Sequence, residues 1–177
     1  HRYLPEEWSI WLDNKSRLKR DPAEVLAALQ GQSGAGFFAF PHFRRDCVYQ
    51  EGQAVWENGL DDYLTVRNRL KDYRAEGMPA HSGLIEGHFL VRRHHDPDLV
   101  AFGESWFGQV VKYSRRDQLS FPYLVWKLGL RCEFIRALEW QETVEFDHLD
   151  RRHRSPDFPR RHRGWQAARR LWHRIRR

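Results

Sequence analysis

The chain has 177 residues, a formal net charge of +6 and no apolar run of the roughly 20 residues that a membrane-spanning helix needs. Eleven arginines and one acidic residue fall within residues 151–177, so the first 150 residues carry a net charge of −4. We therefore predict a mildly acidic domain over residues 1–150 and a basic tail over residues 151–177. The acidic balance of the domain argues against a general nucleic-acid-binding surface.

Strands and helices alternate along the first half of the predicted domain. Residues 8–12, WSIWL, predict a buried strand that ends in a polar loop. Residues 21–31 begin with an Asp-Pro start signal, end in glycine and predict a short helix. Residues 37–40 predict a second strand before a proline, and residues 60–76 keep a helical period.

The same alternation continues in the second half. Residues 84–91 predict a strand, and a helix starting at Asp96 places four apolar residues on one face: Leu99, Phe102, Trp106 and Val110. Another helix runs from about Asp117 to Gly129, before a last strand over residues 130–135. Strands that alternate with helices of this length predict an α/β layer fold.

The two cysteines, Cys47 and Cys132, lie far apart in the sequence and neither belongs to a CxxC pair. This spacing argues against a zinc ribbon or a disulfide framework. It favours a reducing compartment, and we expect a cytoplasmic protein.

Polar residues follow the first two predicted strands. Asp13 and Lys15 come directly after the first strand, where ligands of open α/β sheets collect, although a plain surface turn is the alternative. His42 and Arg45 follow the second strand within the segment HFRRDCVYQE. Arginines in this position either bind a phosphate or sugar hydroxyl or belong to an exposed charged loop.

Two further polar positions interrupt apolar elements. Glu86 lies inside a predicted strand beside a glycine, where a carboxylate is costly unless it is paired with an arginine or faces a ligand. Arg116, Asp117 and Gln118 lie at a predicted helix start, which suits an anion or an active-site carboxylate. Helix capping is the alternative for Asp117. Capping also explains the DPD sequence at residues 96–98 better than metal binding does.

Four segments occur in the order WLDNKSRL, HFRRDCVYQE, GLIEGHFLVRRH and RRDQLSFPY. In these segments the chain resembles the glycosyltransferase-like domain family of plant mucilage-related and turgor-regulation proteins and their bacterial relatives in surface-polysaccharide loci. The resemblance runs from about Trp8 to about Cys132. It implies an α/β fold with a GT-A-like mixed sheet flanked by helices. Only twelve residues precede Asp13, so we expect part of the N-terminal nucleotide-binding half to be missing.

The resemblance implies a transferase that moves a sugar from a nucleotide-diphospho-sugar donor to a polysaccharide or lipid-linked glycan acceptor. The resemblance assigns Asp13 and Lys15 to the metal and diphosphate loop. From the residues themselves, we expect His42, Arg45 and Arg116 to bind the donor and its diphosphate as well. The implied catalytic residues are Glu86, Asp117 and Gln118. A divalent metal, Mn²⁺ or Mg²⁺, is expected on Asp13 and on His148 or His153, with a surface position as the alternative for either histidine.

The basic tail suggests a membrane contact and a rival function. Residues 160–177 place tryptophans on one side of an arginine-rich helical pattern, which suits an anionic membrane surface at the inner face of the membrane. A solvated tail or a helix docked on the domain is the alternative. The rival function is a non-catalytic binding protein whose tail holds nucleic acid or an anionic surface. A third reading is a hydrolase that uses Glu86 and Asp117 as paired carboxylates.

Overall fold

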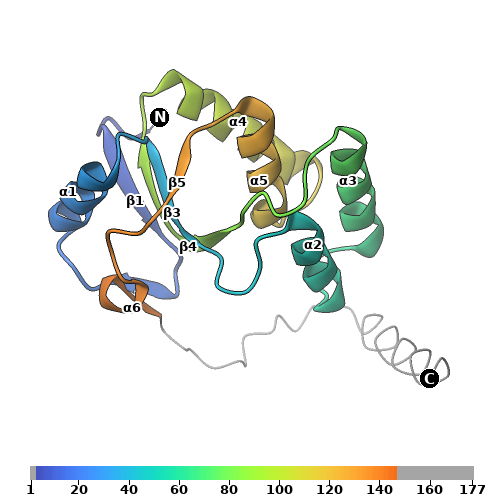
Figure 1. Ribbon diagram of the computed structural model, residues 1–177, viewed down its shortest axis with the longest axis horizontal. Coiled ribbons are helices and arrows are strands. Elements are labelled where there is room, and N and C mark those ends of the chain that lie inside the picture. Colours follow the sequence, from blue (N-terminus) through green and yellow to red (C-terminus); the bar gives the residue numbers. More distant parts are fainter. Residues whose placement is uncertain (1–2, 147–177) are drawn as a thin grey trace.

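A computed structural model describes residues 3–146 of the chain and shows a sheet with helices on both of its faces (Figure 1). The strands are β1 (Trp8–Leu12), β2 (Ser16–Leu18), β3 (Phe37–Pro41), β4 (Ile85–Arg93), β5 (Cys132–Phe134) and β6 (Val144–Phe146). The helices are α1 (Pro22–Gln32), α2 (Val48–Glu57), α3 (Tyr63–Ala75), α4 (Pro97–Lys112), α5 (Asp117–Leu128) and α6 (Trp140–Thr143).

The main sheet has four strands in the order β1-β4-β3-β5, and it is mixed. β4 runs antiparallel to both of its neighbours, whereas β3 and β5 are parallel. The carboxyl ends of β1, β3 and β5 therefore lie at the same edge of the sheet as the start of β4. The predicted mixed sheet flanked by helices is confirmed, and its polar strand ends meet at one edge.

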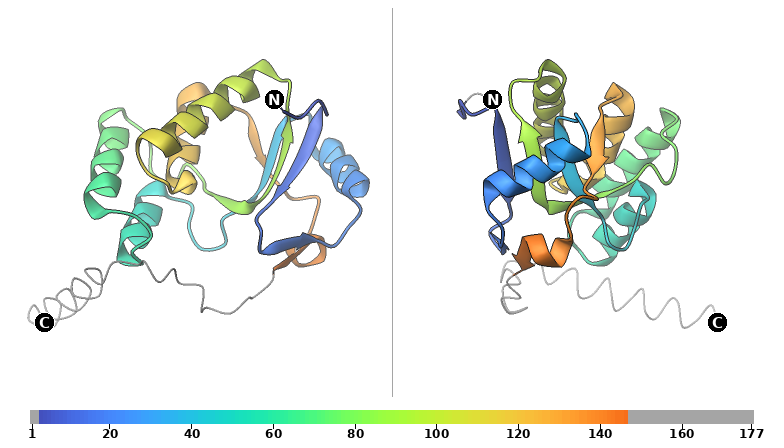
Figure 2. Two further views of the ribbon diagram at one scale, coloured as in Figure 1. Left: turned by 180° about the vertical axis from the view of Figure 1, so that it is seen from behind. Right: turned by 60° about the vertical axis from the view of Figure 1, so that its left-hand side comes forward.

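The sheet separates two hydrophobic cores. Phe37 and Ala39 face a core completed by α2, α3, α4 and α5, whereas Phe38 and Phe40 face a core completed mainly by α1. Successive residues of a strand point to opposite faces, so the uninterrupted apolar run of β3 is what a strand covered on both sides requires. Figure 2 shows α1 on one side of the sheet and α4 and α5 on the other.

β4 contains an irregularity close to its start. Leu90 of β4 pairs with Ala39 of β3, and Ile85 of β4 pairs with Pro41 of β3. Between these two pairs β4 contains more residues than β3. Such a bulge bends a strand and redirects its side chains, and bulges are common beside active sites. Here the additional residues fall in the Glu86–Gly87–His88 segment, at the polar edge of the sheet.

Local start signals agree with the observed helices. The side chains of Asp21, Asp62 and Asp96 each accept a hydrogen bond from a backbone N–H in the first turn of α1, α3 and α4. At the other end of α5, Gly129 adopts φ of 62°, the left-handed conformation that glycine tolerates at a helix end. The carboxylate of Asp96 is thus a helix cap, as its neighbouring proline predicts.

The prediction of a buried first strand is wrong. Within the described part of the chain, β1 is an edge strand of the main sheet that pairs with β4 alone, and Trp11 on it is 52% exposed. The helix predicted to close at Gly31 continues to Gln32. No helix within residues 3–146 is both long enough and apolar enough to cross a membrane. His148 and the tail of residues 151–177 lie outside the described residues.

Candidate active site

The polar edge of the sheet centres on Glu86, which the bulge of β4 buries to 7% exposure. Its Oε1 atom accepts the backbone N–H of Phe43 at 3.3 Å, and its Oε2 atom lies 3.1 Å from Nδ1 of His88. Nε2 of His42 lies 3.8 Å from Oε1. Among residues 3–146, two histidines take the place of the arginine partner considered from the sequence.

The surroundings of Glu86 keep its carboxyl group ionised. Burial alone raises its pKa. The hydrogen bond with His88, the neighbouring His42 and the N–H of Phe43 together outweigh burial, so the net pKa lies below the ordinary 4.5. Glu86 is therefore a carboxylate at neutral pH, held by donors that leave it lone pairs for a ligand.

His42 is oriented by its own loop. Its Nδ1 atom accepts the backbone N–H groups of Arg44, at 3.2 Å, and Arg45, at 3.0 Å. An accepting Nδ1 carries no proton, which assigns the ring proton to Nε2. That nitrogen lies 3.8 Å from carboxylate oxygens of both Glu86 and Glu51. The loop after β3 thus directs one N–H between two buried acids.

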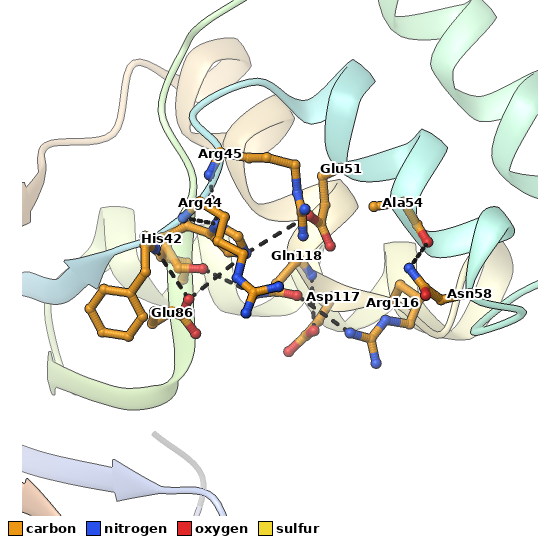
Figure 3. A network of polar contacts seen from close by, with 12 residues as sticks. His42, Arg44, Arg45, Glu51, Ala54, Asn58, Glu86, Arg116, Asp117 and Gln118 are labelled. Carbon is orange, nitrogen blue, oxygen red and sulfur yellow. Dashed lines mark hydrogen bonds and ion pairs between the residues drawn. The ribbon is translucent and has the colours of Figure 1, made fainter. Parts of the chain in front are cut away.

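Glu51 anchors this loop to α2. It is only 3% exposed, and its Oε2 atom lies 2.5 Å from Nε of Arg45 (Figure 3). A buried carboxylate requires such a partner, because an unpaired charge in a low-dielectric site is costly. Arg45, predicted to bind the donor, thus pairs with Glu51 in this structure and fixes the loop that carries His42.

Asp13 joins the same cluster from β1. Its backbone N–H donates to the carbonyl of His88 at 3.0 Å, and its Oδ2 atom lies 3.6 Å from Nε2 of the same histidine. Lys15 extends from the following turn and is exposed. The imidazole of His88 therefore has one ring nitrogen toward Glu86 and the other toward Asp13.

The start of α5 approaches the bulge of β4. The side-chain N–H of Gln118 donates to the carbonyl of Ile85 at 3.1 Å, and a Cβ added at Gly87 would lie 3.9 Å from Oδ2 of Asp117. Arg116 donates to Oε1 of Gln118 at 3.4 Å. Figure 3 shows Gln118 and Asp117 on the side of Glu86 that faces α5. The glycine leaves room for the Asp117 carboxylate beside the strand.

Asp117 does not cap its helix. The capping position of α5 is Arg116, which makes no side-chain capping bond, and Asp117 is the first helical residue. Its Oδ1 atom accepts the N–H of the adjacent Gln118, while its carbonyl accepts the indole N–H of Trp106 and the hydroxyl of Ser120. The structure therefore contradicts the capping alternative. The second carboxylate oxygen of Asp117, Oδ2, lies toward the bulge.

The structure brings most of the predicted site residues to one sheet edge. Asp13, Glu86, Asp117 and their neighbours lie around the bulge of β4, whereas His148 lies outside the described residues. Sequence reasoning overlooked His88, although a two-residue spacing from Glu86 on a predicted strand was a signal for a shared face. Within residues 3–146, no group of three or more His, Cys, Asp or Glu side chains is placed to hold a metal ion.

Comparisons with known proteins identify relatives by sequence. The profile of a family described as "TOD1/MUCI70, glycosyltransferase-like domain" matches residues 1–152. A protein of Arabidopsis thaliana named "Probable hexosyltransferase MUCI70" is 30% identical over an alignment of 143 residues that covers 76% of this chain and 24% of that protein. The chain thus spans about a quarter of the length of this relative. No solved structure matches the chain.

Proposed function

Because the chain belongs to the TOD1/MUCI70 glycosyltransferase-like domain family, we propose that it transfers a hexosyl or pentosyl group from a nucleotide-diphospho-sugar to a polysaccharide or lipid-linked glycan. The observation that supports this most directly is the convergence of Asp13, Glu86 and Asp117 around one bulge. Ligands of open α/β sheets collect at such an edge, beyond the carboxyl ends of strands.

The donor diphosphate lies on the Asp13 side of this edge in the proposal. Lys15 extends from the same turn, and a cation there compensates the negative charge that develops on the leaving diphosphate. Where a substrate carries phosphates, Mg²⁺ is commonly bound by one or two carboxylates together with those phosphates. Asp13 fits this requirement with the donor present, and a metal there would neutralise charge on the departing phosphate. Arg116, at the N-cap of α5, adds positive charge on the α5 side of the bulge.

In the proposal, residues on the other side of the bulge bind the sugars. Glu86 is an ionised carboxylate that accepts hydrogen bonds, so it suits an acceptor hydroxyl. Asp117 and Gln118 present a carboxylate oxygen and an amide from the start of α5. In this arrangement the bulge separates a diphosphate side from a sugar side, and His88 links the two.

Thermal stabilisation by sugar nucleotides tests the proposal. We expect one donor from a panel of common sugar nucleotides to raise the melting temperature of the chain, with a larger shift in Mn²⁺ than in EDTA. Asp13→Asn should remove the metal-dependent part of that shift. Asp98→Asn is the matched control, because Asp98 is exposed at the start of α4, beyond the opposite end of β4.

Two results would contradict this assignment. One is the absence of stabilisation by every donor, together with salt-sensitive DNA binding that depends on residues 151–177, which would favour the non-catalytic binding protein. The other is an Mn²⁺-dependent shift in melting temperature that is equal in Asp13→Asn and the wild type, which would show that Asp13 does not bind the metal. Transfer of radiolabelled sugar to a glycan primer then distinguishes transfer from donor hydrolysis.

The cellular location is part of the same proposal. We infer a cytoplasmic enzyme that meets the inner face of the membrane through residues 160–177, where lipid-linked acceptors are found. Binding to vesicles with anionic lipid should be stronger than to neutral vesicles. It should disappear when residues 160–177 are removed.

A further inference from the structure

Phe43 is an exposed aromatic residue attached to the acidic cluster. Its side chain is 60% exposed, yet its backbone N–H donates to Oε1 of Glu86 at 3.3 Å. Exposed apolar side chains are common when they stand alone. Phe43 differs because its own backbone holds the Glu86 carboxylate, which places this residue at the sheet edge where the sugars are proposed to bind.

A ladder of aromatic rings supports Phe43 from the core. Phe89 and Phe40 are buried, with ring centres 5.5 Å apart. Trp140 on α6 packs edge-on against Phe40 at 4.9 Å, and Phe43 packs against the same indole at 5.2 Å with an interplanar angle of 72°. Edge-to-face contacts of this kind orient rings. The exposed ring is thereby held in place before any ligand arrives, which reduces the entropy cost of binding.

A sugar ring combines the two chemistries that meet here. One face of a pyranose consists largely of C–H groups and packs against an aromatic ring, while its hydroxyl groups donate hydrogen bonds to carboxylates. Phe43 supplies an apolar ring and Glu86 supplies an ionised acceptor. A nucleobase also stacks on aromatic rings, but it lacks the row of hydroxyl donors that a carboxylate selects.

We propose that Phe43, supported by Trp140, is the stacking surface for a pyranose ring of the acceptor glycan, next to Glu86. The proposal rests on the proposed transferase function and adds the position of the acceptor to it. In this proposal α6 positions the exposed ring, because that short helix supplies the indole of Trp140 against which Phe43 packs.

Binding of oligosaccharides in the absence of donor tests this proposal. Cellohexaose, xylohexaose and maltohexaose would be titrated into the 177-residue chain by calorimetry, alongside uridine and guanosine monophosphates. We expect at least one hexasaccharide to bind, and Phe43→Leu to weaken it by roughly fivefold to tenfold, because leucine keeps an apolar surface but has no aromatic face. Phe43→Trp should retain binding.

Phe107→Leu provides the matched control. Phe107 on α4 is 69% exposed, so the substitution is the same in kind and in exposure, and it should leave saccharide affinity unchanged. The proposal is overturned if no hexasaccharide binds, if Phe43→Leu binds as tightly as the wild type, or if only the nucleotides depend on Phe43. Melting temperatures of the variants confirm that each is folded.

The two proposals fail separately. Saccharide binding that depends on Phe43, without stabilisation by any sugar nucleotide, would support a carbohydrate-binding surface and contradict the proposed transferase function. Stabilisation by a donor, with saccharide binding that ignores Phe43, would retain the transferase and place its acceptor elsewhere.

Discussion

His88 and Asp13 meet between β4 and β1 through both backbone and side chain. The carbonyl of His88 accepts the N–H of Asp13 at 3.0 Å, and Nε2 of the imidazole lies 3.6 Å from Oδ2 of the carboxylate. The other ring nitrogen lies 3.1 Å from Glu86. The imidazole of His88 therefore connects Asp13, in the turn proposed to bind the diphosphate, with Glu86, the carboxylate proposed to bind the sugar.

Removing this imidazole should raise the pKa of Glu86. Burial favours the neutral acid, and the hydrogen bond with His88 is the largest of the effects that oppose burial. His88→Ala therefore shifts the Glu86 pKa upward, which a carbon-13 NMR titration of the side-chain carboxyl would measure. His81→Ala is the control, because His81 pairs with Asp46 in an exposed position. An unchanged Glu86 pKa in His88→Ala would show that the imidazole does not support the carboxylate.

The stability of the chain should depend on Glu86 in acid. Its folded-state pKa is lowered, so its contribution is fully present above the ordinary value of 4.5 and is lost as the pH falls through the folded pKa. Glu86→Gln should thus be less stable than the wild type at pH 7, by about 1 kcal/mol or more. The gap should narrow below about pH 4.5.

Urea unfolding followed by circular dichroism across this pH range makes the comparison. Glu139→Gln, at an exposed position before α6, controls for the loss of one surface carboxylate. A stability difference between Glu86→Gln and the wild type that stays constant from pH 7 to pH 3 would contradict the expectation.

The sequence predicted those elements whose signals are local. Asp-Pro pairs mark the starts of α1 and α4, and an apolar run marks β3 as a covered strand. By contrast, β2 and β6 have three residues each and pair across most of the chain, so only tertiary contact defines them. β1 looked buried because its tryptophans are apolar, although Trp11 faces outward from an edge.

The candidate site was predictable in part for the same reason. The polar residues after β1 and β3 indicated a site at one sheet edge, where Asp13 and His42 do lie. Glu86 inside a strand and Asp117 at a helix start were predicted from their own local context, and tertiary contact brings them to that edge. The bulge was not predictable, because it arises from the mismatch in pairing between β4 and β3. His88 had a sequence signal in its two-residue spacing from Glu86, whereas Glu51 is recognised only through the ion pair that joins α2 to the loop after β3.

Loss of the Glu51 carboxylate should destabilise the fold strongly. Glu51 is buried and pairs with Arg45, so Glu51→Leu leaves the guanidinium without its partner and should cost about 3 kcal/mol. The double variant Arg45→Met/Glu51→Leu removes both charges and should recover much of that loss. Urea unfolding of the single and double variants measures the coupling between them. Purely additive effects would mean that the close contact contributes nothing to folding.

Two glycines of the chain should respond differently to alanine. At Gly52 an added Cβ would lie 2.4 Å from Cδ1 of Leu70 and 3.2 Å from Cγ1 of Val66, both of them buried. Overpacking of this kind costs about 1–3 kcal/mol, so Gly52→Ala should lower the melting temperature clearly. At Gly87 the added carbon meets only Oδ2 of Asp117, at 3.9 Å, which is ordinary contact.

Substitution at Gly87 should therefore spare folding and affect the site. Gly87→Ala should unfold at nearly the wild-type urea concentration, whereas the larger side chain in Gly87→Val extends toward Asp117 and should slow sugar transfer by about tenfold or more. Transfer rates and unfolding midpoints of the same preparations separate the two effects. If Gly87→Val transfers sugar at the wild-type rate while remaining folded, the Asp117 carboxylate does not act beside the bulge, and the sugar side of the site has to be sought elsewhere along α5.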